Sequence, residues 1–259
     1  MKSDDSRAES LYTTDEYILK NPTLHEEDSS WKVSKIIPLL DRFAAECKKK
    51  EINLLDVGGG AGTILRETSS YLHKRHSIRV NGFALDLSPG MLKLQKEKNP
   101  EVKCINRDIR ETGLGNKQMD LTLMIDVIEH VPSPEKALKE IKRISDFVIF
   151  KVPLEDNLSL RLWNLLRRGE PRRRWAETIG HVNIYTPGRI RRMVEEHAGR
   201  IVEFGFSNVF GYYLHSDFYM QRMGPGGKIL ARAGAVAYRI SPRLSSFLFS
   251  DFAMILAEC

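Results

Sequence analysis

Three glycines at alternate positions, Gly58, Gly60 and Gly62, directly follow a short apolar stretch at residues 53–57. Glycine lets the backbone adopt positive φ and approach a ligand closely. In an open α/β sheet, a turn of this kind lies where ligands bind. A dinucleotide fingerprint would place its third glycine at the position of Thr63. Asp56, two residues before the first glycine, favours a cationic ligand over a pyrophosphate.

Acidic residues also follow the next two apolar segments. Asp86 and Leu87 follow the first of them, and Asp108 and Ile109 follow the second. An acid at the tip of a second strand can accept hydrogen bonds from both ribose hydroxyls of a nucleoside. An acid after the third strand can accept one from an adenine amino group. The ordinary alternatives are a helix N-terminal acid at Asp86 and a solvated loop acid at Asp108.

Short apolar segments alternate with helical patterns from residue 53 onward, and these elements must position the acids. Such alternation predicts βαβ units and a mostly parallel sheet. The expected fold is α/β: a Rossmann-like open twisted sheet of seven strands, mostly parallel with an antiparallel last strand, and helices on both faces. Helix N-caps are expected at Ser88, Ser133 and Thr186, each followed by proline. The strands are expected at residues 53–57, 79–85, 102–106, 121–125, 147–152, 200–207 and 249–258.

Five motifs occur in order along residues 53–208, which is far more specific than one glycine turn. They are Asp56-Val-Gly58-Gly-Gly60-Ala-Gly62, Asp86, Asp108, Asp126-Val-Ile-Glu129-His130, and Gly180-His181-Val-Asn-Ile-Tyr185-Thr186-Pro. In this order they resemble the class I S-adenosylmethionine-dependent methyltransferases, best the small-molecule branch that includes the ubiquinone-biosynthesis O-methyltransferases. The resemblance implies S-adenosylmethionine as cofactor, with S-adenosylhomocysteine as its product. The implied cofactor-binding residues are Asp56, Gly58, Gly60, Gly62, Asp86, Leu87, Asp108, Ile109 and Asp126.

Three residues are candidates for the chemistry of the acceptor. A general base is needed only where the acceptor must lose a proton. His130 follows the fourth strand and His181 lies in the last motif, so either imidazole could act near neutral pH. Tyr185 could hydrogen-bond an acceptor. Helix capping or a structural hydrogen bond is the alternative role of both histidines. The histidines and carboxylates show no metal-ligand spacing, so no metal is expected.

The chain is expected to have three parts. Residues 1–50 would form an N-terminal arm and helix, and residues 51–208 the cofactor-binding core, with a lid insertion near 154–180. Residues 209–259 would form a substrate-side insertion and the final strand. The polar N-terminus lacks the apolar core of a signal peptide, and the three cysteines form no Cys-x-x-Cys pair. A cytoplasmic protein is therefore predicted, with peripheral membrane contact left open.

The net charge of +6 is concentrated between Arg161 and Arg192, where nine arginines accompany two acids. Such a patch favours an anionic or lipid-linked substrate, an anionic membrane or nucleic acid, and a solvated helix face is the alternative. We expect a lid in which Arg172–Arg174 recognise the acceptor. The leading hypothesis is methyl transfer to an O, N or C atom of a small or lipid-linked, anionic molecule. RNA methylation by the same arginines and a non-catalytic cofactor-binding partner module are alternatives, and an oligomeric state is not predicted.

Overall fold

A single seven-stranded sheet organises the computed structural model, which describes residues 26–170, 172 and 180–259. Its strands are β1 Glu51–Val57, β2 Arg79–Asp86, β3 Lys103–Asn106, β4 Met119–Ile125, β5 Ser145–Leu154, β6 Arg200–Phe206 and β7 Asp251–Glu258. The order across the sheet is β3-β2-β1-β4-β5-β7-β6. Strands β1 to β5 pair in parallel, and β7 pairs antiparallel with both β5 and β6. The predicted fold class, with its antiparallel last strand, is confirmed.

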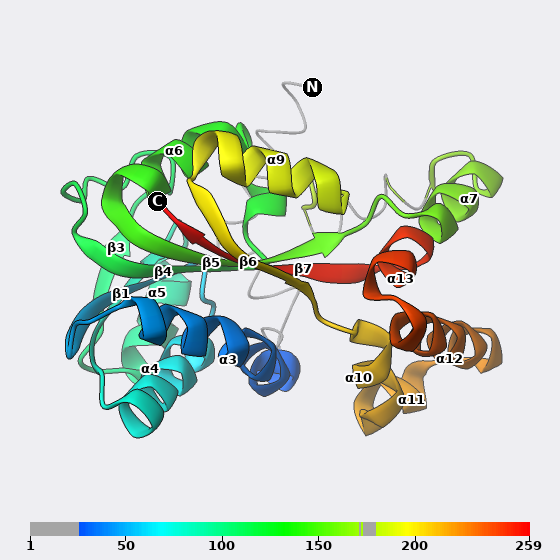
Figure 1. Ribbon diagram of the computed structural model, residues 1–259, viewed down its shortest axis with the longest axis horizontal. Helices are drawn as coiled ribbons and strands as arrows, with labels where there is room; N and C mark the ends of the chain where they lie inside the picture. The colour runs from blue at the N-terminus through cyan, green and yellow to red at the C-terminus, as the bar shows by residue number, and fades with distance from the viewer. Residues whose placement is uncertain (1–25, 171, 173–179) are drawn as a thin grey trace.

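Helices cover both faces of the sheet, as Figure 1 shows. On one face α6 and α9 bury apolar side chains against the strands, and on the other α3, α4 and α5 do so. The short helices η1 and η2 precede α3 and α6. The bounds are η1 Glu26–Asp28, α3 Ser29–Glu46, α4 Thr63–His76, α5 Pro89–Lys98, η2 Ile128–His130, α6 Pro134–Ile144 and α9 Pro187–His197.

The strand order reverses direction between β1 and β4, which are neighbours in the sheet. One half of the sheet grows from β1 toward β3 and the other from β4 toward β6, so the loops after β1 and β4 diverge. In open α/β sheets the crevice at such a switch point, outside the carboxyl ends of the strands, is where ligands bind. The topology therefore places the glycine loop and the Asp126-to-His130 segment on two sides of one crevice.

Two of the three predicted N-caps are confirmed with a side-chain hydrogen bond. The Ser88 side chain accepts a hydrogen bond from the Met91 N–H at 3.1 Å, and that of Thr186 accepts one from the Arg189 N–H at 3.1 Å. Ser133 is the N-cap residue of α6, as predicted, but it does not cap the helix with its side chain. This residue has φ 55 and its side chain makes no capping hydrogen bond. N-cap side chains bond the N2 or N3 amide from an extended backbone, which Ser133 does not have.

Residues 209–248 form a group of four helices that the sequence pattern did not place, and we call it the helical lobe. It comprises α10 Val209–His215, α11 Asp217–Arg222, α12 Pro225–Ile240 and α13 Pro242–Leu248. The lobe lies beyond one end of the sheet, beside α7 Leu158–Leu166 (Figure 1). Small residues hold α12 against α10: a side chain at Gly234 would collide with the Phe210 ring. Within the described ranges, no helix is both long and apolar enough to cross a membrane.

Candidate functional site

A cleft of about 480 Å³ opens at the carboxyl ends of β1, β2 and β4. Its walls come from the glycine loop, the Asp86–Ser88 turn, the segment after β3 and the segment from Ile125 to Pro132. Lys32 of α3 and Tyr213 of α10 complete it. Segments that are distant in the sequence therefore meet here, as the topology requires.

The glycine loop follows the predicted conformation, but its members have different roles. Gly58 and Gly60 have φ of 61 and 55 and line the cleft. A side chain at Gly60 would meet nothing within 4 Å, so this backbone is open to a ligand. Gly62 does not line the cleft, and a side chain there would collide with Gln95 and Asn99 of the α5 region. Gly62 thus serves helix packing, a role that the sequence pattern did not separate from ligand contact.

Asp56 lies beneath the loop and does not line the cleft, in contrast to the contact expected from the sequence. Its side chain is 1% exposed, and neither carboxylate oxygen has a hydrogen-bond partner among the described residues. A side chain at Gly59 would collide with this carboxylate, so the loop backbone covers it. Burial, with a contribution from Asp86, raises the pKa of Asp56 to about 7. An unpaired buried carboxylate of this kind favours a positive charge nearby.

Asp86 ends β2 and lines the cleft, as predicted. One carboxylate oxygen accepts a hydrogen bond from the Ser88 N–H at 2.8 Å. Burial raises the pKa of Asp86 to about 6, although the Ser88 and Leu87 amides oppose this shift. The Asn106 side chain of β3 donates to the carbonyls of Asp86 and Leu87, both at 2.9 Å, and fixes the turn. The acid is thereby held at the tip of the second strand.

Asp108 and Ile109 also line the cleft, and Ile109 is 6% exposed. The Asp108 carboxylate accepts hydrogen bonds from the Arg110 backbone at 2.7 Å and from its guanidinium at 2.6 Å. Burial alone would raise the pKa of Asp108, but these Arg110 contacts hold it below its usual range. Asp108 is therefore an ionised, oriented acceptor, while Ile109 supplies apolar surface beside it.

The Asp126 carboxylate forms ion pairs with two lysines that the sequence did not indicate. Its carboxylate contacts the Lys151 ammonium at 2.5 and 2.7 Å and the Lys32 ammonium at 3.2 Å. Burial opposes ionisation, yet these two lysines hold the pKa of Asp126 at about 2. Lys151 is fully buried, with its ammonium 3.3 Å from the centre of the Phe252 ring. A lysine within the otherwise apolar run from Phe147 to Leu154 of β5 was the one available signal.

Asp126 also has φ 58 and donates its backbone N–H to the Lys151 carbonyl at 2.9 Å. A positive φ in a residue other than glycine stores strain, which the surrounding contacts must outweigh. The two lysines and this hydrogen bond hold the residue in place. The turn after β4 therefore begins in one fixed orientation, with its backbone at the cleft.

Glu129, His130 and His181 meet on one side of the cleft, although 51 positions separate the two histidines in the sequence. The Val182 and Asn183 amides donate to the Glu129 carbonyl at 3.0 and 2.9 Å, which ties the later segment onto η2. The two imidazole centres are 4.7 Å apart. Ligand atoms of all three residues lie within 4.8 Å of one another. The spacing along the chain showed no sign of this cluster, because the fold and not the spacing brings these residues together.

Hydrogen bonds orient both imidazoles in the same way. The His130 Nδ1 donates to the Gly180 carbonyl at 3.1 Å, and the His181 Nδ1 contacts the Glu155 carboxylate at 2.8 Å. In each neutral ring, Nε2 is then the basic nitrogen. Burial acts to lower the pKa of His181, but Glu155 raises it above its usual range. This arrangement suits either proton transfer or binding of a divalent metal, whose histidine ligands usually carry such a second partner.

Glu129 is 1% exposed, and neither of its carboxylate oxygens has a hydrogen-bond partner among the described residues. Burial and the charge of Asp126 raise its pKa to about 8. A buried carboxyl group of this kind is neutral near pH 7 unless a cation approaches it. Of the three residues in the cluster, Glu129 is thus the one whose protonation state depends most on a bound cation.

Tyr185 lies in the core and not in the cleft. It is 0% exposed, and its hydroxyl donates to the Ile128 carbonyl at 3.4 Å. The acceptor contact expected for Tyr185 finds no support in this position, because the ring packs between β-sheet and helix residues. Tyr185 instead helps to hold η2, and with it His130, against the sheet.

The charges of the cleft fit the cofactor that the sequence implied. Seven acids, of which Glu129 is neutral until a cation approaches, line the cleft with only three lysine or arginine side chains. The acids are Glu26, Asp28, Asp86, Asp108, Asp126, Glu129 and Glu155. S-adenosylmethionine carries a sulfonium and an ammonium and no phosphate, so an acidic cleft attracts it, whereas a pyrophosphate would be repelled. Asp86, Asp108 and the open backbone at Gly60 are placed to hold such a molecule.

Comparisons with known proteins agree with this site. Residues 55–146 match the protein family described as a methyltransferase domain. The ubiquinone/menaquinone biosynthesis C-methyltransferase of Campylobacter jejuni is 28% identical over 98 residues, which cover 37% of this chain and 41% of that protein. The chain thus spans about two fifths of that relative's length. The resemblance to class I S-adenosylmethionine-dependent methyltransferases, and S-adenosylmethionine as the cofactor, are confirmed at the level of this family.

Solved structures show the same fold at low sequence identity. A chain in the complex between the Haloferax volcanii Trm112 methyltransferase activator and a methyltransferase has a TM-score of 0.58 and 15% identity, covering 93% of this chain and 95% of that chain. Geranyl diphosphate C-methyltransferase from Streptomyces coelicolor, solved with Mg²⁺, geranyl diphosphate and S-adenosylhomocysteine, has a TM-score of 0.55 and 10% identity. It covers 85% of this chain and 79% of that chain.

Proposed function

We propose that this chain is an S-adenosylmethionine-dependent methyltransferase that transfers a methyl group to an O, N or C atom of a small molecule. The observation that carries the proposal is the acidic cleft at the switch point of the sheet, with Asp86 at the tip of the second strand. The match of residues 55–146 to a methyltransferase domain supports it.

Each part of the cleft then has a task. Asp86 accepts the ribose hydroxyls, Asp108 with Ile109 holds the adenine, and the backbone near Gly58 and Gly60 approaches the amino-acid end. The cofactor supplies a methyl group that is already activated. The protein mainly positions the two reactants and excludes water from them. Where the acceptor must lose a proton, Nε2 of His130 or His181 takes it.

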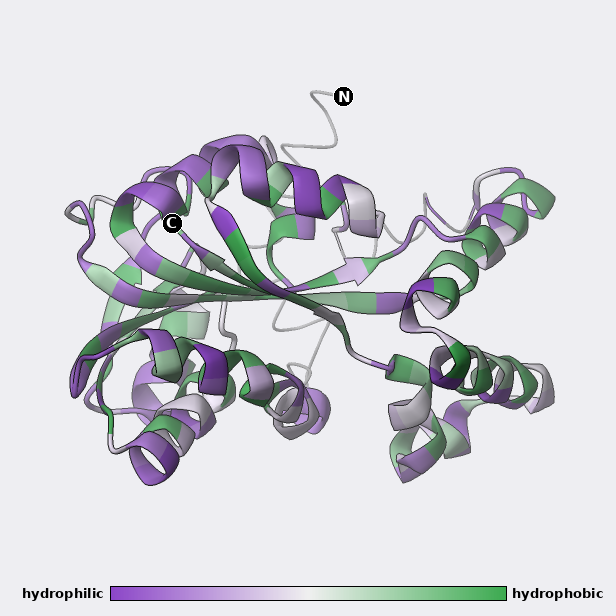
Figure 2. Ribbon diagram, in the orientation of Figure 1, coloured by the Kyte–Doolittle hydropathy of each residue, from purple (hydrophilic) through white to green (hydrophobic). Residues whose placement is uncertain are grey.

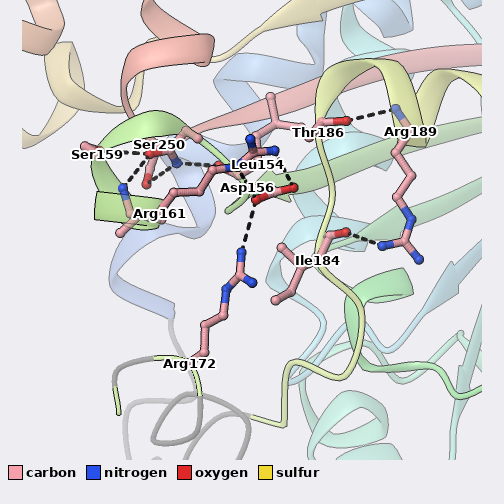
Figure 3. Close-up of polar contacts among 11 residues, drawn as sticks. Leu154, Asp156, Ser159, Arg161, Arg172, Ile184, Thr186, Arg189 and Ser250 are labelled. Atoms are coloured by element: carbon pink, nitrogen blue, oxygen red, sulfur yellow. Dashed lines mark hydrogen bonds and ion pairs between the residues drawn. The ribbon is translucent and has the colours of Figure 1, made fainter. Parts of the chain in front are cut away.

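We further propose an anionic or lipid-linked acceptor. Glu155 lines the cleft, and the next residue, Asp156, holds two guanidinium groups (Figure 3). Its carboxylate contacts Arg161 at 2.8 Å and Arg172 at 3.1 Å. Two guanidinium groups thus gather on one carboxylate next to the cleft, where they are placed to meet an anionic group of an acceptor. Arg173 and Arg174, which the sequence also assigned to this lid, lie outside the described residues.

Calorimetric titration tests the cofactor assignment. Wild-type protein should bind S-adenosylmethionine and S-adenosylhomocysteine, and Asp86→Ala should weaken both by about 100-fold, because two hydrogen bonds to a charged group are lost. Glu203→Ala, an exposed acid on β6, is the matched control and should bind normally. Binding of NADH in place of the adenosyl ligands would overturn the proposal. Tight cofactor binding without turnover on any acceptor would favour the non-catalytic alternative.

A further inference from the structure

The large apolar side chains that are exposed in the described part of the chain all belong to three helices, α7, α12 and α13. On α7, Leu165 and Leu166 are 75% and 81% exposed, and this helix has no buried residue. On α13, Phe247 is 61% exposed. Figure 2 shows the apolar colouring of these helices at the end of the molecule away from α4 and α6. A concentration of this kind marks an interaction surface.

In α12 the small residues face the core and the large apolar residues face outward. This is the reverse of an ordinary surface helix. Its buried positions are Ala231, Gly234 and Ala237, all small. Ile229, Val236 and Ile240 recur at the spacing of one helix face and are 66%, 55% and 73% exposed. A surface helix normally turns its large apolar residues toward the core. The outward face of α12 is therefore built to contact something apolar.

Positive charge accompanies this apolar surface. Residues 218–250 contain five lysine or arginine residues and no acid. Residues 158–169 contain three arginines and no acid. On α12 the exposed Arg232 and Arg239 each follow an outward apolar residue by three positions, so they flank the apolar face. Apolar side chains bordered by arginine are the pattern of a helix that lies in the plane of a membrane interface.

We propose that the surface formed by α7, α12 and α13 docks on an anionic lipid membrane. Lipid acyl chains cover the leucine, isoleucine and phenylalanine side chains, and the arginines meet the phosphate headgroups. A second copy of the chain is a poor occupant, because the same basic residues would face one another. An acidic headgroup layer offers the complementary charge together with an apolar interior.

The docking surface adjoins the cleft. Tyr213 of α10 lines the cleft, and the Phe210 ring on the same helix packs against Gly234 of α12. Helix α10 therefore links the wall of the cleft that carries Tyr213 to the inner side of α12, whose outward face would lie on the membrane. A lipid-linked acceptor would reach the cleft from this side. The docking itself does not depend on the proposed methyl transfer, so each can be tested without the other.

Vesicle co-sedimentation of the full chain tests the proposal. Wild type should bind vesicles of equal parts phosphatidylglycerol and phosphatidylcholine, and should bind phosphatidylcholine vesicles far less. The variant Leu166→Ser/Val236→Ser/Ile240→Ser should lose about tenfold or more in partitioning, because apolar side chains no longer enter the interface. The matched variant Leu166→Ile/Val236→Ile/Ile240→Val keeps the surface apolar and should bind as wild type does.

Charge reversal separates lipid binding from general attraction to polyanions. Arg232→Glu/Arg239→Glu should weaken binding to the anionic vesicles by about tenfold or more. Lys74→Glu/Lys139→Glu, on exposed positions of α4 and α6, should not. The proposal is overturned if the serine variant binds vesicles as wild type does, or if wild type ignores anionic vesicles. Salt-sensitive RNA binding that survives the serine substitutions while vesicle binding is absent would identify RNA as the partner instead.

Discussion

The cleft and the helical lobe differ in which side chains they bury and which they expose. The Glu129 carboxylate at the cleft and the Asp56 carboxylate beneath the glycine loop are buried without a hydrogen-bond partner among the described residues, while the apolar residues of the strands are fully packed. In the lobe and α7, leucines and isoleucines are exposed, while α12 turns small residues such as Gly234 toward the interior. Neither arrangement lowers the free energy of the isolated chain. Each is explained by a binding partner, a small cation in the first case and a lipid surface in the second.

This contrast separates residues needed for the fold from residues placed for a partner. A charge that is buried and paired, such as Lys151, is held by the fold, so its removal should destabilise the protein. Substitution of a buried acid that lacks a hydrogen-bond partner should affect binding or turnover. An exposed leucine should affect neither stability nor cofactor binding. The following predictions test these differences in order of decreasing effect.

Lys151→Met should lower the free energy of unfolding by about 3–5 kcal/mol, because it removes the buried partner of the half-buried Asp126 carboxylate and leaves it with Lys32 alone. Denaturant titration measures the change. Lys49→Met is the matched control, since this lysine is 58% exposed beside Asp120, and it should cost less than about 1 kcal/mol. Equal losses for the two variants would contradict the structural role of Lys151.

His181→Ala should reduce turnover by about 100-fold or more, with little change in cofactor affinity, if the cluster of Glu129, His130 and His181 acts on the acceptor. Steady-state kinetics beside calorimetry distinguishes the two effects. Treatment with a chelator then separates the two uses of the cluster. Loss of turnover that added Mg²⁺ or Zn²⁺ restores indicates a bound metal, and indifference to the chelator indicates proton transfer. Unchanged turnover in His181→Ala would remove the cluster from the mechanism.

Cofactor affinity should fall by about tenfold between pH 7 and pH 5, because burial raises the pKa of Asp86 to about 6 and a cationic ligand prefers its ionised form. Titration across this range measures it, and Asp86→Asn should bind weakly with little pH dependence. The stability of the unliganded protein should depend on pH in the opposite direction, so that it falls as the pH rises. Asp86 and Asp56 have pKa values above those of the unfolded chain, so their contribution to stability is lost as the pH rises through about 6 to 7. An affinity that rises as the pH falls would contradict this assignment.

Leu166→Ala should change the free energy of unfolding by less than about 0.5 kcal/mol, because this side chain is 81% exposed. The same substitution at Leu138 of α6, which is fully buried, should cost about 2–5 kcal/mol. Thermal and denaturant unfolding of this matched pair checks the contrast. A large loss at Leu166 would mean that α7 is part of the packed core and would weaken the case for a docking surface.

The sequence alone predicted the cofactor-binding part of the chain, because the features that define this part act locally. The alternation of apolar strands and helices predicted the sheet, since each strand must be buried on both faces. The capping residues Ser88 and Thr186 act within a few positions of themselves, so their roles followed directly from the sequence. Asp86 and Asp108 were identified for the same reason, because a residue at the end of a parallel strand lies at the ligand edge whatever the remaining chain does.

Contacts between distant segments decided the rest. Glu129 and His181 meet only because backbone amides near residue 182 bind η2, and Lys32 joins Asp126 only because α3 packs beneath the sheet. Gly62 and Tyr185 resembled site residues in their motifs but face other elements. Helix α12 of the lobe turns its small residues inward and its large ones outward, which inverts the usual arrangement of a surface helix, and only the folded structure shows which face is buried. The sequence by itself determined the sheet, its ligand edge and the type of cofactor. Only the tertiary structure decided which charges are paired and which apolar faces stay exposed, because both depend on neighbours that the chain brings together by folding.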